Sequence, residues 1–130
     1  MTTELTYLVL TLLLALVQVM LPAAARTVEF GSKWNAGARD TTPEARKPLT
    51  GRLERAQANL YETLPLFIGA VLIAQVADRT GVLTTWGAAL YFWARVAYIP
   101  LYALGVPYIR SLVWLVSLAG LILILVALFI

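Results

Sequence analysis

Four long apolar stretches follow one another along the chain, and polar segments separate them. They cover residues 5–25, 52–77, 83–104 and 108–130. A membrane-spanning helix needs about 20 predominantly apolar residues, so each stretch is long enough to cross a bilayer. Because the later connections are short, consecutive helices should run in opposite directions. The pattern predicts an all-α integral membrane protein, an antiparallel four-helix bundle in a single domain of residues 1–130.

The first apolar stretch has a second interpretation, a cleaved signal peptide, because Ala23-Ala24-Ala25 is similar to a cleavage site. A signal peptide has a basic N-terminal region and a shorter apolar stretch. Here Glu4 is the only charge before the apolar run, and the run is longer than a signal peptide requires. The sequence therefore favours a retained membrane helix.

The polar segment 26–51 is predicted to be a cytoplasmic loop. Seven of the ten basic residues lie in it or at the start of the next helix: Arg26, Lys33, Arg39, Arg46, Lys47, Arg52 and Arg55. Cytoplasmic loops of membrane proteins carry an excess of Lys and Arg. Both termini are then expected outside. At the other cytoplasmic connection, Pro107 suits the first turn of the last helix, where its missing N–H costs nothing.

Composition supports lipid as the solvent and narrows the chemistry. The chain is 61% hydrophobic and 13% charged, whereas soluble domains are roughly 45–50% apolar and about a quarter charged. It has no cysteine and no histidine, so acid–base chemistry must use Arg, Tyr, Glu, Asp or a bound ligand. The net charge of +3 comes mainly from arginine, which fits either the positive-inside rule or recognition of an anionic ligand.

A polar stripe runs along the predicted helix 52–77. Arg55, Asn59 and Glu62 are spaced by four and three residues, so they fall within about 60° of one another on one helix face. Polar residues in a membrane helix face protein or a water-filled cavity. This stripe is therefore a candidate site.

A second stripe lies on the predicted helix 83–104, with Arg95, Tyr98 and Tyr102 at the same spacing. Arg95 and Glu62 each lie roughly ten residues from the cytoplasmic side, about 15 Å deep. The sequence predicts that they are adjacent and form a buried pair. The last helix adds Arg110 and Ser111 at the cytoplasmic rim.

Each of these residues also has a purely structural interpretation. A Glu62–Arg95 pair could fix helix register rather than bind a ligand. Arg55 and Arg110 could be interface anchors, and the tyrosines could pack with their hydroxyls bonded to neighbours. Four other aromatic residues are assigned to packing or to the membrane interface: Trp86, Tyr91, Trp93 and Trp114.

Several arginines around one carboxylate suit a ligand that carries carboxylates and one amine. The set consists of Arg55, Arg95 and Arg110, with Arg39 or Arg52 as a further member. Arginine binds carboxylates with a bidentate fork, and Glu62 would take an ammonium group. Glutathione has these groups, and an arginine beside its sulfur would favour the thiolate. The residues alone indicate a polar anionic ligand that enters from the cytoplasm.

Two stretches together resemble the MAPEG family, the membrane-associated proteins in eicosanoid and glutathione metabolism. One stretch is Arg55-Ala-Gln-Ala-Asn59-Leu-Tyr-Glu62-Thr-Leu-Pro; the other contains Arg95-Val-Ala-Tyr98, Tyr102 and Pro107-Tyr-Ile-Arg110-Ser111. Order, spacing, chain length and topology agree over about three quarters of the chain. A third stretch, Gly37-Ala-Arg39-Asp40, is similar to a loop of bacterial-type members, so a bacterial inner membrane is expected.

The resemblance implies a homotrimer that holds glutathione between subunits near the cytoplasmic side. It places Arg55, Asn59, Glu62, Tyr102, Arg110 and Ser111 at glutathione-site positions, and Arg110 opposite the thiolate. Departures from the eicosanoid enzymes are Ala58, where a basic residue is frequent, and Gln57 and Tyr98, which replace histidines. Fewer charge contacts to glutathione would follow.

The predicted function is that of a glutathione-dependent transferase or peroxidase acting on lipophilic electrophiles. A non-catalytic ligand-binding or assembly subunit of the same fold is the alternative. A small multidrug carrier is disfavoured, because such carriers centre on a carboxylate in their first helix and residues 5–25 contain none. The predicted partners are the bilayer, further copies of the chain and a hydrophobic small molecule, with no nucleic acid and no metal.

Overall fold

A computed structural model describes residues 1–40 and 47–130, and this part of the chain is helical without any strand. The helices are α1 (Thr3–Phe30), α2 (Ser32–Ala36), α3 (Pro48–Val76), α4 (Val82–Ala103) and α5 (Tyr108–Ala127). The all-α prediction is thus confirmed for the described residues. Arg46, which belongs to the predicted basic loop, lies outside them.

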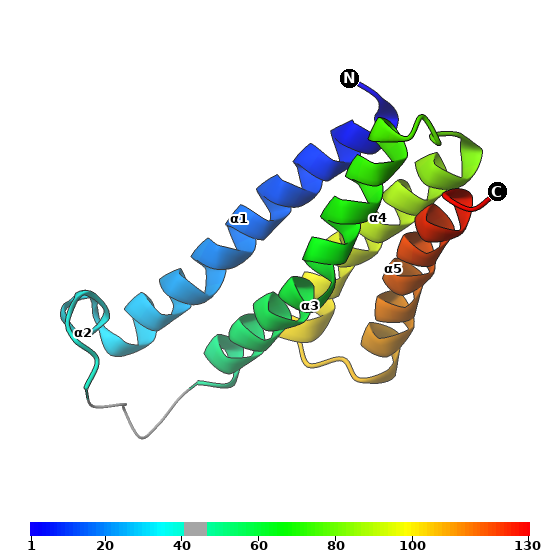
Figure 1. The fold of residues 1–130 in the computed structure, drawn as a ribbon. Coiled ribbons are helices and arrows are strands. Elements are labelled where there is room, and N and C mark those ends of the chain that lie inside the picture. Colours follow the sequence, from blue (N-terminus) through cyan, green and yellow to red (C-terminus); the bar gives the residue numbers. More distant parts are fainter. Residues whose placement is uncertain (41–46) are drawn as a thin grey trace.

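The four long helices run alternately in opposite directions, so the N- and C-termini lie at the same end (Figure 1). α3 contacts α1, α4 and α5, while α4 packs most extensively against α5. Their shared core contains Leu60, Phe67, Val71, Tyr91 and Ile124. The rings of Phe67 and Tyr91 stack with centroids 4.1 Å apart, and this stack fixes α3 against α4.

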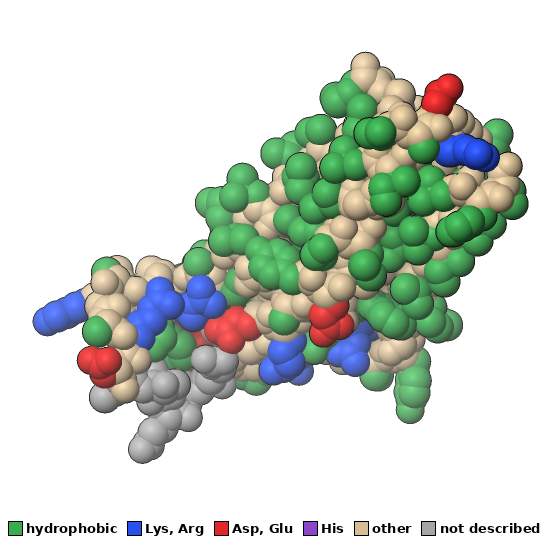
Figure 2. All heavy atoms as spheres, viewed as in Figure 1, with side chains coloured by type: hydrophobic (Ala, Val, Ile, Leu, Met, Phe, Trp, Pro, Cys, Tyr) green, Lys and Arg blue, Asp and Glu red, His purple; other side chains and the backbone are tan. Residues whose placement is uncertain are grey.

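Three helices, α1, α3 and α5, are long and apolar enough to cross a membrane. Figure 2 shows apolar side chains over the body of the molecule and most charges near the end that carries α2. α4 has 22 residues, enough for a span of about 20. Its apolar residues are interrupted by Arg95, two threonines and three tyrosines, which lowers its hydropathy. A fourth crossing by α4 therefore stays a prediction.

The predicted loop 26–51 is partly wrong, because helices occupy both of its ends. α1 continues to Phe30, and α3 already begins at Pro48, which occupies its first turn. Hydropathy marks only the part of a helix that lies in hydrocarbon, whereas backbone hydrogen bonds can continue beyond it. The true stop of α1 is Gly31, whose φ of +90° suits glycine.

Polar contacts join the end of α1 to the beginning of α3. Arg26 and Glu54 form an ion pair at 3.3 Å. Glu29 accepts hydrogen bonds from the backbone N–H of Lys47 and from the Thr50 hydroxyl. A carboxylate at this position accepts a hydrogen bond from a backbone N–H that has no partner within α3. Its negative charge also interacts favourably with the positive end of the α3 dipole. These contacts hold α1 beside the helix that carries the first polar stripe.

At the opposite end of the molecule, Glu4 is buried between α1 and α4. Its Oε1 accepts hydrogen bonds from the hydroxyls of Thr84 at 2.7 Å and Thr85 at 2.8 Å. A buried carboxylate is costly unless hydrogen bonds compensate it, and these two do so. Glu4 thus joins the two helix beginnings and is more than a charge at the edge of an apolar run.

Gly87 and Gly120 allow α4 and α5 to approach closely. A Cβ on Gly120 would lie 2.5 Å from the carbonyl oxygen of Gly87 and 2.8 Å from the backbone nitrogen of Tyr91. Gly120→Ala should therefore push the helices apart and lower the free energy of unfolding by about 1–3 kcal/mol. Gly69→Ala is the matched control, because nothing lies within 4 Å of the added Cβ. Thermal unfolding in mild detergent measures both; equal melting temperatures would contradict the close approach.

Candidate functional site

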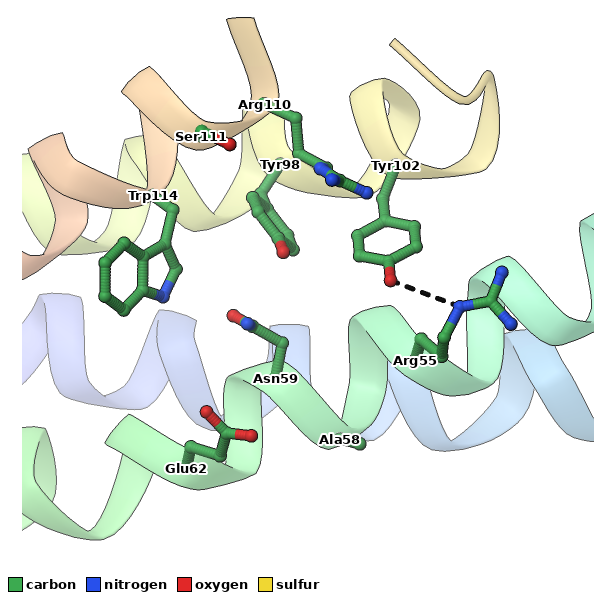
Figure 3. Close-up of a pocket in the computed structure, with 9 residues that line it drawn as sticks. All are labelled: Arg55, Ala58, Asn59, Glu62, Tyr98, Tyr102, Arg110, Ser111 and Trp114. Atoms are coloured by element: carbon green, nitrogen blue, oxygen red, sulfur yellow. Dashed lines mark hydrogen bonds between the residues drawn. The ribbon is translucent and has the colours of Figure 1, made fainter. Parts of the chain in front are cut away.

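A cavity of about 430 Å³ lies between α3, α4 and α5 (Figure 3). Its walls are formed by Arg55, Ala58, Asn59, Glu62, Tyr98, Tyr102, Arg110, Ser111 and Trp114. The structure thus brings together most of the predicted site residues; Arg95 and the further candidates Arg39 and Arg52 do not line the cavity. A cavity of this size falls in the range of small-molecule sites, about 300–1,000 Å³.

One end of the cavity is positively charged. Arg55 donates a hydrogen bond from Nε to the Tyr102 hydroxyl at 3.2 Å, which Figure 3 shows as a dashed line. The Arg110 guanidinium lies over the Tyr102 ring, 4.5 Å from its centroid. Tyr102 therefore lies between two guanidinium groups and orients both. Neither arginine forms an ion pair with an acidic side chain in the described part of the chain, so both can bind an anion.

The other end of the cavity carries the acidic group. Glu62 lies two turns further along α3 than Arg55, and Figure 3 shows its carboxylate directed toward the cavity. Trp114 of α5 lies at the same end. A molecule that spans the cavity would meet cations at the rim and an anion further inside. This charge order suits a ligand with separated negative and positive groups.

Arg95 lies behind the cavity wall rather than in it. It is only 1% exposed and donates a hydrogen bond from Nη1 to Asn59 Oδ1 at 2.8 Å. Its guanidinium also lies 4.4 Å from the centroid of the Tyr98 ring. Because arginine has only donors, Asn59 must turn its oxygen toward Arg95. The Asn59 amide N–H groups are then left for the cavity, and Arg95 positions this donor.

The predicted Glu62–Arg95 ion pair is wrong. Among the described residues the pair within 4 Å is Arg26–Glu54, and Glu62 is exposed. Glu62 and Arg95 were predicted to be partners because they lie at equal depth, but the direction of each side chain around its helix also matters. Glu62 lies about 60° around α3 from Asn59. Asn59 occupies the edge of the stripe that faces α4 and takes the hydrogen bond of Arg95. Glu62 occupies the other edge.

Two further arginines considered for the ligand have other contacts. Arg52 donates to the Ala103 carbonyl at 3.4 Å, where it binds the C-terminal end of α4. Arg39 donates to Asn35 and lies over the Trp34 ring, 5.4 Å from its centroid. Neither lines the cavity.

Trp114 belongs to the cavity wall, although the sequence pattern assigned it to packing or to the membrane interface. The available signal was its spacing, three residues after Ser111 and four after Arg110, which places all three on one face of α5. Tyr98 combines a place in the cavity wall with packing against its neighbour. It lines the cavity, is buried and contacts Tyr102 edge-to-face at 5.6 Å.

The helices and the charged cavity define an integral membrane protein with a polar site beside an apolar body. The model of the MAPEG family matches residues 7–130, nearly the whole chain. The chain therefore belongs to the MAPEG family, and the resemblance noted in its sequence is confirmed. No curated protein and no solved structure gives a match to it.

Proposed function

We propose that the protein is a glutathione-dependent transferase or peroxidase that acts on lipophilic electrophiles. The observation that carries this proposal is the donor set of the cavity. Two guanidinium groups, of Arg55 and Arg110, lie at the rim, and one carboxylate, that of Glu62, lies further inside. Membership of the MAPEG family supports the same conclusion, because glutathione is the ligand associated with that family.

The cavity residues fit glutathione group by group. Arg55, the Asn59 amide and the Ser111 hydroxyl would hold its carboxylates, since charge-assisted hydrogen bonds are the strong ones. Glu62 would hold its ammonium group. When bound, glutathione supplies a thiolate nucleophile. Arg110 would keep the sulfur ionised, because a nearby cation lowers a thiol pKa.

The test is ultraviolet absorbance of the thiolate when glutathione is added to the purified protein at neutral pH. A new absorbance that saturates with glutathione is expected. If the protein binds glutathione without forming thiolate, the non-catalytic alternative gains support. Ala58 favours the non-catalytic alternative, because it lines the cavity without adding a charge that could contact glutathione. If no binding occurs at millimolar concentration, the proposed function is wrong.

We also propose that a second copy of the chain completes the site, in a homotrimer as the family resemblance implies. Arg55 and Glu62 are exposed in the single chain, although both belong to a candidate membrane span. Charged side chains that face lipid are costly and are normally covered by protein or water. Mass measurement in mild detergent or native lipid should find a trimer. Finding only monomers would contradict an intersubunit site.

The orientation with α2 and the cavity rim on the cytoplasmic side, and both termini outside, remains our proposal. It rests on the basic residues near the end that carries α2 (Figure 2) and on the positive-inside rule. A reporter that is active only in the cytoplasm, fused after Ile130, should give no signal. The same reporter inserted after Arg39 should be active, and the opposite pattern would reverse the orientation.

A further inference from the structure

A second groove lies between α1 and α3, where the end of α1 lies beside the beginning of α3 (Figure 1). Its volume is about 260 Å³, and its walls are formed by Ala24, Ala25, Val28, Glu29, Lys47, Leu49 and Thr50. None of these residues lines the cavity between α3, α4 and α5. The groove is therefore separate from the proposed glutathione site.

The groove lies where α1 leaves the hydrocarbon of the bilayer. Ala24 and Ala25 end the uncharged run of α1, and Arg26 is the first charged residue after it. Glu29 follows Ala25 by four residues, about 6 Å along the helix axis. The headgroup layer has a similar thickness, because a hydrocarbon core of about 30 Å lies within a bilayer of about 40–45 Å. The groove thus extends from the edge of the hydrocarbon into the headgroup layer.

The apolar walls of the groove are open to the surroundings. Val28 is 81% exposed and Leu49 is 50% exposed. Exposed apolar side chains on both sides of a groove indicate a surface that another molecule covers. At this depth that molecule is a phospholipid, whose acyl chain can lie along the small side chains of Ala24 and Ala25.

The charged walls indicate which headgroup fits. The two oxygens of the Glu29 carboxylate accept hydrogen bonds from the Lys47 backbone N–H and the Thr50 hydroxyl, and each oxygen can accept another. In the described part of the chain, neither the Glu29 carboxylate nor the Lys47 ammonium forms an ion pair. An anionic headgroup would be attracted by Lys47 and repelled by Glu29. A zwitterionic headgroup whose ammonium group donates hydrogen bonds matches both residues.

We propose that this groove binds a phospholipid with an ethanolamine headgroup. The ammonium group of the lipid donates to the Glu29 carboxylate, its phosphate accepts from the Lys47 ammonium, and an acyl chain covers the apolar walls. Phosphatidylcholine makes only the phosphate contact, because its quaternary ammonium has no N–H to donate. Phosphatidylglycerol has no cation for Glu29. The groove therefore distinguishes phospholipids by headgroup.

Native mass spectrometry of the protein in mild detergent tests the proposal, because it separates bound lipids by mass. The protein is titrated with phosphatidylethanolamine, phosphatidylcholine or phosphatidylglycerol of identical acyl chains. Phosphatidylethanolamine should bind about ten-fold more tightly than the other two, the ratio expected for one hydrogen bond to a charged group. Equal affinities would overturn the proposal. Tightest binding of phosphatidylglycerol would also overturn it, since the basic residues alone would then attract the lipid.

Three variants test whether the lipid occupies this groove. Glu29→Gln keeps an acceptor for the beginning of α3 but removes the charge, so the preference for phosphatidylethanolamine over phosphatidylcholine should disappear. Lys47→Gln should lower the affinity for both lipids equally and retain the preference. Asp40→Asn is the control, because it also removes one acidic charge but lies outside the groove walls, and it should bind lipids as the parent does. If Glu29→Gln retains the preference, the groove is not the site. Glutathione is absent from these titrations, so failure of the proposed function would not affect their result.

Discussion

Arg110→Ala is expected to abolish thiolate formation while leaving the proposed homotrimer intact. A glutathione thiol with its ordinary pKa of about 8.5 is only about 3% ionised at pH 7, whereas protein environments can lower a thiol pKa to between about 3.5 and 7.5. Removing the cation should therefore reduce the thiolate absorbance at neutral pH by roughly ten-fold or more. The measurement is the absorbance of purified variant and parent at saturating glutathione.

The same variant should fold normally. Arg110 is only partly buried, and its principal contact is with the face of the Tyr102 ring. Exposed cation–π contacts contribute about 0.5–1 kcal/mol, too little to unfold the protein. Arg110→Lys is the matched control, since it keeps the charge but loses the planar fork, and partial ionisation is expected. If Arg110→Ala still ionises glutathione at neutral pH, Arg110 has no role in thiolate formation.

Helical periodicity predicted which side chains would come together at the cavity, but it did not predict their partners. The spacing of Arg55, Asn59 and Glu62 placed them on one face, and the structure shows all three at the cavity wall. The choice between Asn59 and Glu62 as partner of Arg95 depended on a rotation of about 60° around α3. That rotation depends on how α3 packs against α4, which no local pattern contains.

The ends of the helices were also not predictable from hydropathy. The apolar run ends near Ala25, yet α1 continues to Phe30 and is joined to α3 by Arg26 and Glu29. Polar residues can belong to a helix once it leaves the hydrocarbon, so composition no longer distinguishes helix from loop. Pro48 was a usable signal, because proline favours the first turn of a helix.

Trp114 shows the same difficulty at the level of a single residue. Tryptophan is frequent at membrane interfaces, so composition assigned it there. Its unpaired indole N–H is visible only once three helices are packed. The spacing of polar residues thus located most of the cavity wall from sequence, neutral members such as Asn59 and Tyr102 included, whereas Trp114 was recognised as part of it only in the tertiary structure.

Glu62→Gln is expected to weaken glutathione binding by about 10- to 100-fold. A hydrogen bond to a charged group contributes about 1.5–3 kcal/mol, and each 1.4 kcal/mol corresponds to about ten-fold in affinity. The melting temperature should change little, because Glu62 is exposed and its carboxylate forms no ion pair in the described part of the chain. Isothermal titration of glutathione into the protein in mild detergent measures the loss.

Two comparisons identify the cause of that loss. Glu54→Gln makes the same change of charge on the same helix, but Glu54 lies outside the cavity wall and pairs with Arg26, so glutathione affinity should be retained. N-acetylglutathione lacks the ammonium group, so its affinity should be low for the parent and should not fall further in Glu62→Gln. If Glu62→Gln lowers the affinity for glutathione and for N-acetylglutathione equally, the carboxylate affects the shape or the electrostatic field of the cavity and does not bind the ammonium group. If it lowers the melting temperature without changing affinity, Glu62 belongs to the fold, and the cation of the ligand must be recognised elsewhere.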